Sequence, residues 1–549
     1  MRMSSQSLSS GDTSALEEPL EFPARGKTDS LRPAFKSSKE EETARELFMT
    51  LVFIVVLDAL FRSMAKGLWF DEILTVLVSG QTHLSGTWDL LTHGVDGHPM
   101  GMYLIERVMG KLGGNERLIY RLPSIAAFLC VMVCMFSFVR RRAGGLVALI
   151  SAGALLLTNV YDPFAFEARS YGVMIAFIAL ALMCYERADS KKWAVLLALS
   201  LMAATSMHFY AVLAFFPFGV AELTILITER RFRLPVWSAF VAGMLPYIVF
   251  WPILKAQRVL YGAHFWATPS FFNLAKALGE LIHMRTSISF TAFTVTMIFL
   301  AIMIRTGNYR VRKTDGPGIG HSTIDFALSV GFFSMPIVTY VAARISHGGV
   351  SGRYLTVTDL GICLVLSLFL SRLQKPAIVF IGLFLLILFA YQEGTHWKDV
   401  LTPKKVKDLM AAPEQMSKDM NVPLVVSNGL IYLPVWRRAN DELRSRIVFL
   451  ADPQEQLAAS GSDTTTLLLM TLKNYEPVNV QSFSEFAEKH RKFLIFSNGD
   501  SQDIWPRWLL EHGYSPRVVS IETPPKSDME DGPDPPKAIV YLVDLDERK

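Results

Sequence analysis

The most chemically suggestive residues of this chain form an acidic pair, Asp71-Glu72, which follows the first apolar stretch. The hydrocarbon layer of a membrane rejects unpaired carboxylates, so an acidic pair at its edge is a candidate for function. A carboxylate at a partly desolvated interface can have its pKa raised toward that of a general base, which could deprotonate an incoming hydroxyl group. The structural alternative is that both acids complement the positive end of a short interfacial helix.

Further polar groups lie at loop positions later in the chain. Asp96-Gly97-His98-Pro99 is typical of a turn, and the residues after it form an amphipathic helix that could lie on a membrane surface. Glu167-Ala168-Arg169-Ser170-Tyr171 and Arg353-Tyr354 each contain an arginine within two residues of a tyrosine. Arginine suits phosphate because it donates two parallel hydrogen bonds, and Glu167 could bind a metal ion or a sugar hydroxyl. The alternative for these residues is that they form local ion pairs or interfacial anchors. His208 lies at the end of another apolar stretch, and its alternative is an ordinary interfacial side chain.

The composition indicates a membrane protein. Of 549 residues, 51% are hydrophobic and 19% are charged, whereas an ordinary soluble domain has about a quarter charged residues. The net charge is only +4, and no compact run of Lys and Arg is typical of a protein that binds nucleic acid. All four cysteines fall inside apolar stretches, so no disulfide framework or zinc site is indicated.

A membrane span needs about 20 predominantly apolar residues, and the sequence offers about eleven such stretches. We predict spans near residues 46–62, 119–139, 144–161, 170–186, 193–207, 209–228, 235–254, 286–304, 325–344, 354–371 and 376–392. The first loop, near residues 63–118, is long and contains two predicted interfacial helices. A structured loop of this size is usually functional.

Positive residues stay on the cytoplasmic side of a membrane, and this rule orients the predicted spans. Five basic groups fall on one side, at Arg140–Arg142, Lys191-Lys192, Arg230–Arg233, Arg310–Lys313 and Arg372–Lys375. Every candidate residue then falls on the other side: Asp71, Glu72, His98, Glu167, Arg169, Tyr171, His208, Arg353 and Tyr354. We therefore expect one extracytoplasmic site built from residues that are far apart in the sequence.

The two ends of the chain differ from its middle. Residues 1–43 are rich in Ser, Pro and charged residues, which predicts a disordered cytoplasmic tail. Residues 44–392 form the membrane domain. Residues 393–549 predict a small extracytoplasmic α/β domain, because short β-rich runs at 423–427, 447–450, 493–497 and 538–543 are separated by helical stretches such as 504–512. A Pro- and Asp-rich stretch at 524–536 predicts a surface loop.

The order of the motifs resembles the GT-C superfamily of polytopic glycosyltransferases. An acidic pair follows the first span, His98-Pro99 precedes an amphipathic helix, and Arg121–Ser124 opens the second span. Glu167–Tyr171, His208–Tyr210 and Arg353-Tyr354 then follow at the expected positions. The resemblance is to the bacterial branch related to protein O-mannosyltransferases and lipopolysaccharide-core galacturonosyltransferases, and it covers about residues 46–392. One departure is Met100, where relatives often have a second proline.

This resemblance implies a membrane all-α fold of GT-C type and a polyprenyl-phosphate monosaccharide as donor. The sugar would pass to a glycan, lipid or protein hydroxyl on the outer face of the bacterial inner membrane, with inversion at the anomeric carbon. The resemblance implies a catalytic role for Asp71, with Glu72 beside it, and a donor-phosphate role for arginines on this face, which here would be Arg169 and Arg353. His98, Glu167, Tyr171, His208 and Tyr354 complete the donor site. No cofactor is certain, and a divalent cation remains possible.

Other functions compete with this one. A transporter or lipid flippase with an outer partner-binding domain should bury charge near the midplane and often shows related halves with broken spans, whereas here charge gathers at one rim. A second alternative is a non-catalytic membrane scaffold, and only the order of the motifs argues against it. An enzyme that uses a lipid-diphosphate glycan is disfavoured by the acidic pair in the first loop.

Overall fold

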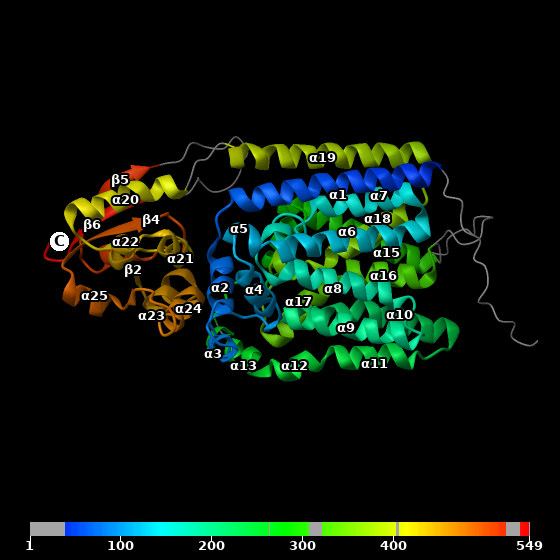
Figure 1. The fold of residues 1–549 in the computed structure, drawn as a ribbon, viewed down its shortest axis with the longest axis horizontal. Helices are drawn as coiled ribbons and strands as arrows, with labels where there is room; N and C mark the ends of the chain where they lie inside the picture. Colours follow the sequence, from blue (N-terminus) through cyan, green and yellow to red (C-terminus); the bar gives the residue numbers. More distant parts are fainter. Residues whose placement is uncertain (1–38, 263, 307–320, 402–405, 523–537, 548–549) are drawn as a thin grey trace, which may run out of the picture.

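The computed structural model describes residues 39–262, 264–306, 321–401, 406–522 and 538–547. A bundle of long helices makes up most of it, and an α/β unit lies at one end of the bundle (Figure 1). The predicted membrane all-α fold with a small C-terminal α/β region is confirmed. Most of the predicted tail (1–43) and the predicted loop at 524–536 lie outside the described residues.

Each predicted span overlaps one helix or up to three consecutive helices, three in the case of 235–254. The bundle contains α1 (Lys39–Ala65), α6 (Leu122–Ala143), α7 (Gly145–Gly153), η1 (Ala154–Leu157), α8 (Ser170–Tyr185), α9 (Lys191–Met207), η3 (Phe209–Ala214), α10 (Phe215–Glu229), α11 (Leu234–Gly243), α12 (Leu245–Val249), α13 (Trp251–Tyr261), α14 (Phe271–Leu281), α15 (Thr286–Thr306), α16 (Thr323–Phe333), α17 (Met335–Ser346), α18 (Val357–Leu370) and α19 (Lys375–Leu401). The first helix begins at Lys39, inside the predicted tail, where Glu40, Glu41 and Glu42 complement its positive end.

Length and apolar composition support a multi-pass membrane protein. Among the described residues, five helices are long and apolar enough to cross a membrane, and two bent helix pairs raise this number to seven. Three shorter apolar helices, Gly145–Leu157, Ser170–Tyr185 and Val357–Leu370, lie within the same bundle. The bends, of 59° between α12 and α13 and of 50° between α16 and α17, coincide with Pro252 and Pro336 at the start of the second helix of each pair.

The basic loops meet at one end of the bundle, which we call the basic end. Arg141 lies 2.7 Å from Glu186, Arg142 lies 2.7 Å from Asp325, and Lys375 lies 2.9 Å from Glu40. Arg231 pairs with Asp189 in the same set of loops. These loops contain predicted basic groups, whereas the predicted group at Arg310–Lys313 lies outside the described residues, and the α/β unit lies at the opposite end of the bundle (Figure 1).

Short helices of the first long loop cover that opposite end. They are α2 (Phe70–Ser79), α3 (Leu84–Thr92), α4 (Gly101–Leu112) and α5 (Glu116–Ile119). The long loop is thus structured, as predicted, and it contains four short helices instead of two. A 3₁₀ turn, η2 (Phe164–Phe166), and another, η4 (Gly352–Tyr354), lie in the loops before α8 and α18.

The C-terminal unit, residues 406–547, is a six-stranded mixed sheet with helices on both faces. Strands β1 (Leu424–Val426), β2 (Ile447–Leu450), β3 (Val480–Gln481) and β4 (Lys492–Ser497) are parallel, and β5 (Arg517–Glu522) and β6 (Ala538–Asp544) add antiparallel pairs in the order β3-β2-β1-β4-β6-β5. Its helices are α20 (Val406–Met420), α21 (Gly429–Arg438), α22 (Asp441–Arg446), α23 (Pro453–Ser460), α24 (Thr464–Leu472), α25 (Phe483–Lys489) and α26 (Trp505–Glu511). All four predicted strands are present, and β3 and β5 were missed.

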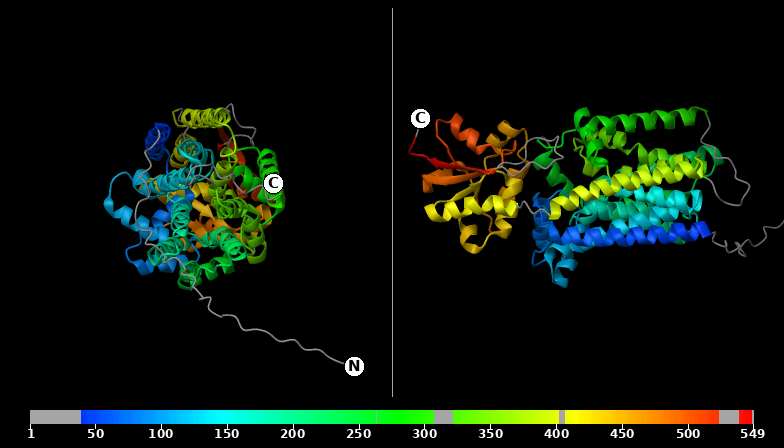
Figure 2. Two further views of the ribbon diagram at one scale, coloured as in Figure 1. Left: turned by 90° about the vertical axis from the view of Figure 1, so that its right-hand side faces the viewer. Right: turned by 90° about the horizontal axis from the view of Figure 1, so that it is seen from above.

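Alternation along the strands divides the sheet into two apolar faces. Leu424 and Val426 of β1 belong to a cluster that also contains residues of α2 and α3, whereas Val425 belongs to a second cluster with α25 and α26. The side-chain period of two in a strand explains this division. One face of the sheet therefore shares its core with the first long loop, and Figure 2 shows the unit seated against that end of the bundle.

Candidate active site

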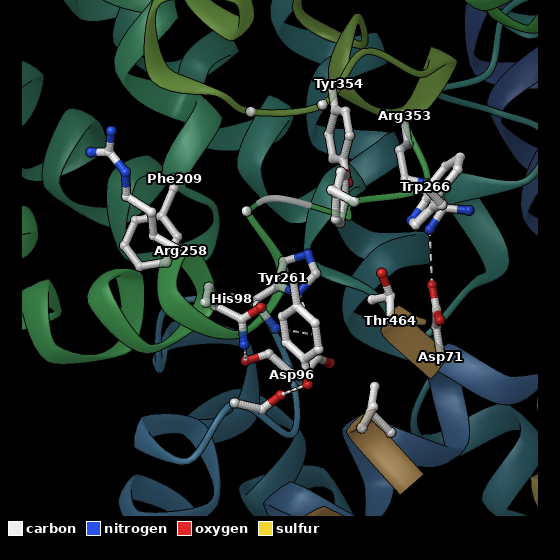
Figure 3. Close-up of a pocket in the computed structure, with 18 of the residues that line it drawn as sticks. Asp71, Asp96, His98, Phe209, Arg258, Tyr261, Trp266, Arg353, Tyr354 and Thr464 are labelled. Atoms are coloured by element: carbon white, nitrogen blue, oxygen red, sulfur yellow. Dashed lines mark hydrogen bonds and ion pairs between the residues drawn. The ribbon is translucent and has the colours of Figure 1, made fainter. Parts of the chain in front are cut away.

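A cavity of about 580 Å³ lies where the bundle meets the C-terminal unit (Figure 3). Its volume is in the range of known small-molecule sites. Residues from the first long loop, the loop before α8, the α9–η3 junction, α13, residues 346–354 and the C-terminal unit line it. The lining includes seven of the nine predicted site residues, namely Asp71, His98, Arg169, Tyr171, His208, Arg353 and Tyr354.

Asp71 reaches the cavity from the first turn of α2. Its carboxylate oxygen Oδ2 accepts a hydrogen bond of 2.9 Å from Arg353 Nη1, and Arg169 Nη2 lies 3.9 Å away. In the described part of the chain, no hydrogen bond to the other oxygen, Oδ1, is seen. Because the side chain is 16% exposed, this oxygen can meet a molecule in the cavity. The orientation of the Asp71 carboxylate is thus fixed by Arg353, while its Oδ1 atom can accept a hydrogen bond from a molecule in the cavity.

Asp96, His98 and Arg169 form a buried cluster in the cavity wall. Arg169 Nη1 lies 2.6 Å from Asp96 Oδ2, and His98 Nδ1 lies 2.9 Å from Asp96 Oδ1. Burial opposes ionisation of Asp96, but Arg169 and His98 outweigh it and hold the pKa of this carboxyl well below its usual value. Burial and the charge of Arg169 lower the pKa of His98, which favours a neutral ring, and its Nδ1 faces both Asp96 Oδ1 and Arg169 Nη2, the latter at 3.1 Å. Its Nε2 atom is buried without a partner in the described structure.

Arg169 is fixed by this cluster. Besides Asp96, it donates hydrogen bonds to the Thr75 hydroxyl at 2.9 Å and to the Asp71 carbonyl at 3.1 Å, and it is only 5% exposed. Its Nε is buried without a hydrogen-bond partner in the described structure, and the phosphate-binding role of Arg169 stays a prediction. The contacts of its other donors hold α2 and the Asp96 turn against each other.

His208 is also neutral. Its Nδ1 accepts a hydrogen bond of 3.0 Å from the Tyr210 backbone N–H, which leaves the ring proton on Nε2. Burial and the nearby His98 lower its pKa well below the usual value. The ring lies 4.8 Å from that of His98 and 5.1 Å from that of Tyr171. These rings pack edge-on or tilted against one another and form a wall beside the Asp96 cluster.

Arg353 is the more accessible of the two predicted arginines. Its guanidinium lies within 6 Å of the rings of Trp69, Tyr171 and Trp266, which is a cation–π arrangement. Its side chain is 26% exposed, and Tyr354 beside it stacks on Tyr210 at 4.7 Å. The three rings shield a cation that can still contact a ligand.

Glu72 does not line the cavity. Its carboxylate receives two hydrogen bonds, of 2.7 and 2.6 Å, from Arg121, and a third of 2.8 Å from the Ala168 N–H. Arg121 in turn donates to the carbonyls of Ser63, Lys66 and Gly67, and both side chains are fully buried. This pair fixes the start of α2 and holds the Glu72 carboxylate outside the cavity lining, and the catalytic role of Glu72 stays a prediction.

Glu167 also lies outside the cavity lining. Its nearest cation is Lys66, at 3.7 Å, and its side chain is 7% exposed. Burial, only partly offset by Lys66, raises the pKa of Glu167 to about 7. The Ser124 hydroxyl donates to the Glu167 backbone carbonyl at 2.5 Å, which ties this loop to α6. The predicted contact of Glu167 with a sugar has no support in this geometry.

Lys255 and Arg258, on α13, line the cavity and were not singled out from the sequence. Both are exposed, and within the described residues neither has an ion-pair partner. Figure 3 shows Arg258 across the cavity from Asp71. The predicted span at 235–254 ended directly before them, on the side where few basic residues are expected. Because they are basic residues on the predicted outer side, Lys255 and Arg258 are an exception to the positive-inside rule, and this exception could have identified them from the sequence.

A metal site is not evident in the described part of the chain, which contains no group of three or more His, Cys, Asp and Glu side chains that could hold an ion. The carboxylates at the cavity, Asp71 and Asp96, are each paired with arginine. The possible divalent cation therefore stays a prediction.

Comparisons with known proteins found a family model that matches part of the chain and several similar solved structures. The model of the family described as dolichyl-phosphate-mannose-protein mannosyltransferase matches residues 96–255, from the Asp96 turn to Lys255. A search of curated proteins found no match to the sequence.

Among solved structures, 18 chains match. The crystal structure of ArnT from Cupriavidus metallidurans bound to undecaprenyl phosphate is 12% identical, covers 91% of this chain and 97% of its own, and has a TM-score of 0.50. The apo state of the same protein covers 91% and 98%, with 12% identity and a TM-score of 0.39. At this level of identity the likeness to the bound form concerns the fold.

Proposed function

We propose that this chain is a polytopic membrane glycosyltransferase of the GT-C superfamily and that it transfers a monosaccharide from a polyprenyl-phosphate donor to an acceptor hydroxyl. The reaction would take place on the outer face of the bacterial inner membrane, with the N-terminus in the cytoplasm. The solved ArnT structure holds undecaprenyl phosphate, which supports a donor of this class.

The observation that carries the proposal is the combination of Asp71 with accessible cations in one cavity at the end of an apolar bundle. Arg353 faces Asp71, and Lys255 and Arg258 lie on the α13 wall. A lipid phosphate can approach along α13, where Trp251 and Val259 expose their apolar side chains. Cations that are already positioned where negative charge develops in the transition state typically make a large contribution to catalysis.

In the proposed reaction, Asp71 Oδ1 accepts the proton of the acceptor hydroxyl while the hydroxyl oxygen attacks the anomeric carbon. The bond between the anomeric carbon and the phosphate oxygen breaks, and its electron pair leaves on the polyprenyl phosphate. Arg353, which pairs with Asp71 at 2.9 Å in the free enzyme, binds the phosphate when donor is present. A single displacement of this kind inverts the anomeric centre.

The proposal is tested with purified protein in lipid nanodiscs, a panel of polyprenyl-phosphate sugars and mass analysis of the products. We expect one donor to yield a glycosylated acceptor and the anomeric configuration to be inverted. Asp71→Asn should lower the rate at least about 100-fold, as expected for loss of a general base, with normal protein level and thermal stability. Asp441→Asn, at a fully exposed side chain of the C-terminal unit, is the matched control.

Two results would contradict the proposal. The first is that no donor in the panel is consumed by folded wild-type protein. The second is full activity of Asp71→Asn, which would remove Asp71 from the mechanism. Repeating the assay with a chelator and with added Mg²⁺ or Mn²⁺ tests the possible divalent cation.

A further inference from the structure

The C-terminal unit packs against the first long loop, which contains α2, through a shared apolar core. Phe70, Ile73 and Leu74 of α2 belong to the same buried cluster as Leu433 and Trp436 of α21. Polar contacts surround this core: Tyr475 donates to Asp89 at 2.9 Å, Gln81 donates to Glu476 at 3.0 Å, and Arg437 pairs with Glu116 at 3.1 Å. The unit therefore packs directly against the helix that carries Asp71.

This unit also supplies one wall of the cavity. Ser462, Thr464, Thr465 and Leu468, at the start of α24, line the cavity together with Leu430 and Gln502. His264, from the segment after α13, lies 3.7 Å from Asp463, and its carbonyl accepts a hydrogen bond from Thr464. Figure 3 shows Thr464 on the same cavity as Asp71 and Arg353.

The two sides of the cavity differ in charge. Every lining residue from the C-terminal unit is neutral, and four of the six present a hydroxyl or an amide group. All the charged lining residues, including Asp71, Arg353, Lys255 and Arg258, come from the membrane part. Hydroxyl and amide groups both donate and accept hydrogen bonds, which matches the hydroxyl groups of a sugar and gives no compensation for a phosphate charge.

The direction of approach separates donor from acceptor. The lipid tail of a polyprenyl donor must remain in the bilayer, so its phosphate meets the cations of the membrane part. An acceptor that attacks opposite the leaving phosphate arrives from the side of the C-terminal unit. The hydroxyl-rich start of α24 lies on that route.

We propose that the C-terminal unit forms the acceptor subsite through Thr464, Thr465 and Gln502 and that it selects an uncharged, polyhydroxylated acceptor such as a neutral glycan. This inference rests on the proposed glycosyl transfer and goes beyond it, because it assigns a substrate class and a role to a domain that could otherwise be only a cover. The hydroxyls of Thr464 and Thr465 bind acceptor hydroxyls, while Leu430 and Leu468 exclude water.

The test uses full-length protein with the donor found in the panel. The acceptor probes are neutral hexose oligosaccharides and the same oligosaccharides bearing one phosphate. We expect the double variant Thr464→Val/Thr465→Val to raise the acceptor KM about tenfold, the effect of losing two ordinary hydrogen bonds, with little change in donor KM. Thr471→Val, in the same helix but outside the cavity lining, is the matched control, since within the described residues its hydroxyl bonds only to the Leu467 carbonyl.

The outcomes are distinct. If wild-type protein consumes no donor, the glycosyltransferase function fails. If the wild type is active but the double variant keeps its acceptor KM at unchanged thermal stability, only the acceptor subsite is wrong. A rise in donor KM alone would assign these threonines to the donor sugar, and better transfer to the phosphorylated probe would overturn the neutral acceptor. If the double variant fails to fold, Gln502→Leu is measured by the same criteria.

Discussion

Glu106, on α4, is a buried carboxyl group that the proposed reaction does not use. Its side chain is fully buried, and within the described structure neither carboxyl oxygen has a hydrogen-bond partner. Burial, with repulsion from Glu72, raises the pKa of Glu106 to about 9. Between its unfolded pKa of about 4.5 and this value, the folded protein keeps a proton that the unfolded chain has lost. Glu106 therefore makes the protein less stable as pH rises through this window, by up to about 1.4 kcal/mol per pH unit.

Replacing Glu106 by glutamine should remove this dependence, because the amide has nearly the same shape and does not ionise. We expect Glu106→Gln to melt at a higher temperature than wild type at pH 8 and at nearly the same temperature at pH 5. The melting temperature of purified protein between pH 5 and pH 8.5 measures this. Glu229→Gln, at an exposed end of α10, should show the wild-type profile. Parallel profiles for Glu106→Gln and wild type would contradict a buried, protonated Glu106.

At the level of single residues, the sequence predicted the location of the site better than the task of each residue. Successive helix residues point about 100° apart, so Asp71 and Glu72 could not both face one cavity once α2 began at Phe70. Which of them would face Arg121 depended on the packing of α6 against the first loop, and no local pattern carries that information. Glu167 and Tyr171 were separated in the same way, the first toward Lys66 and the second toward the cavity.

At the level of elements, glycine sets how closely two bundle helices approach. A methyl group at Gly361, on α18, would overlap the backbone of Phe332 and Phe333 at the end of α16. Gly361→Ala should therefore force these helices apart and destabilise the protein by about 1–3 kcal/mol, the usual cost of overpacking. Gly219→Ala, on α10, is the matched control, because a methyl group there meets no atom within 4 Å.

Thermal unfolding in one detergent, with retention of monodisperse protein on gel filtration, measures both variants. Gly361→Ala should lose part of its folded yield, whereas Gly219→Ala should behave as wild type. Equal melting temperatures for the two would show that α16 and α18 are not in close contact.

Hydropathy was sufficient to predict most bundle helices, because a long apolar run has few alternatives to a helix inside a membrane. It could not place the bends. The run at 235–254 was predicted as one span, but Pro252 starts a separate helix, α13, that turns away by 59° and brings Lys255 and Arg258 to the cavity. Proline lowers the cost of a bend without fixing its angle, which depends on packing against neighbouring helices.

At the level of the whole molecule, the C-terminal unit is joined to the bundle by the core it shares with α2 and α3. The sequence predicted its α/β composition and four of its strands, because each is a short apolar run between turn residues. It gave no indication that one sheet face would be continuous with the first long loop. That continuity arises from contacts between segments more than 300 residues apart, such as Gln81 with Glu476.

The shared core predicts that a cavity-creating substitution on one face of the sheet lowers the transfer rate, whereas an equally destabilising substitution on the other face does not. Leu433, on α21, lies in the cluster that contains α2, and Leu509, on α26, lies in the cluster on the opposite face. Both are fully buried, so each leucine-to-alanine change should destabilise the protein by about 2–5 kcal/mol.

Only Leu433→Ala should also lower the transfer rate at a temperature where both variants are folded, because the cavity it leaves loosens the support of α2 and therefore of Asp71. Initial rates at 15 °C or more below each melting temperature make the comparison. Equal rates for the two variants would mean that the C-terminal unit holds its position without orienting Asp71, and a larger loss for Leu509→Ala would reverse the assignment of the two faces.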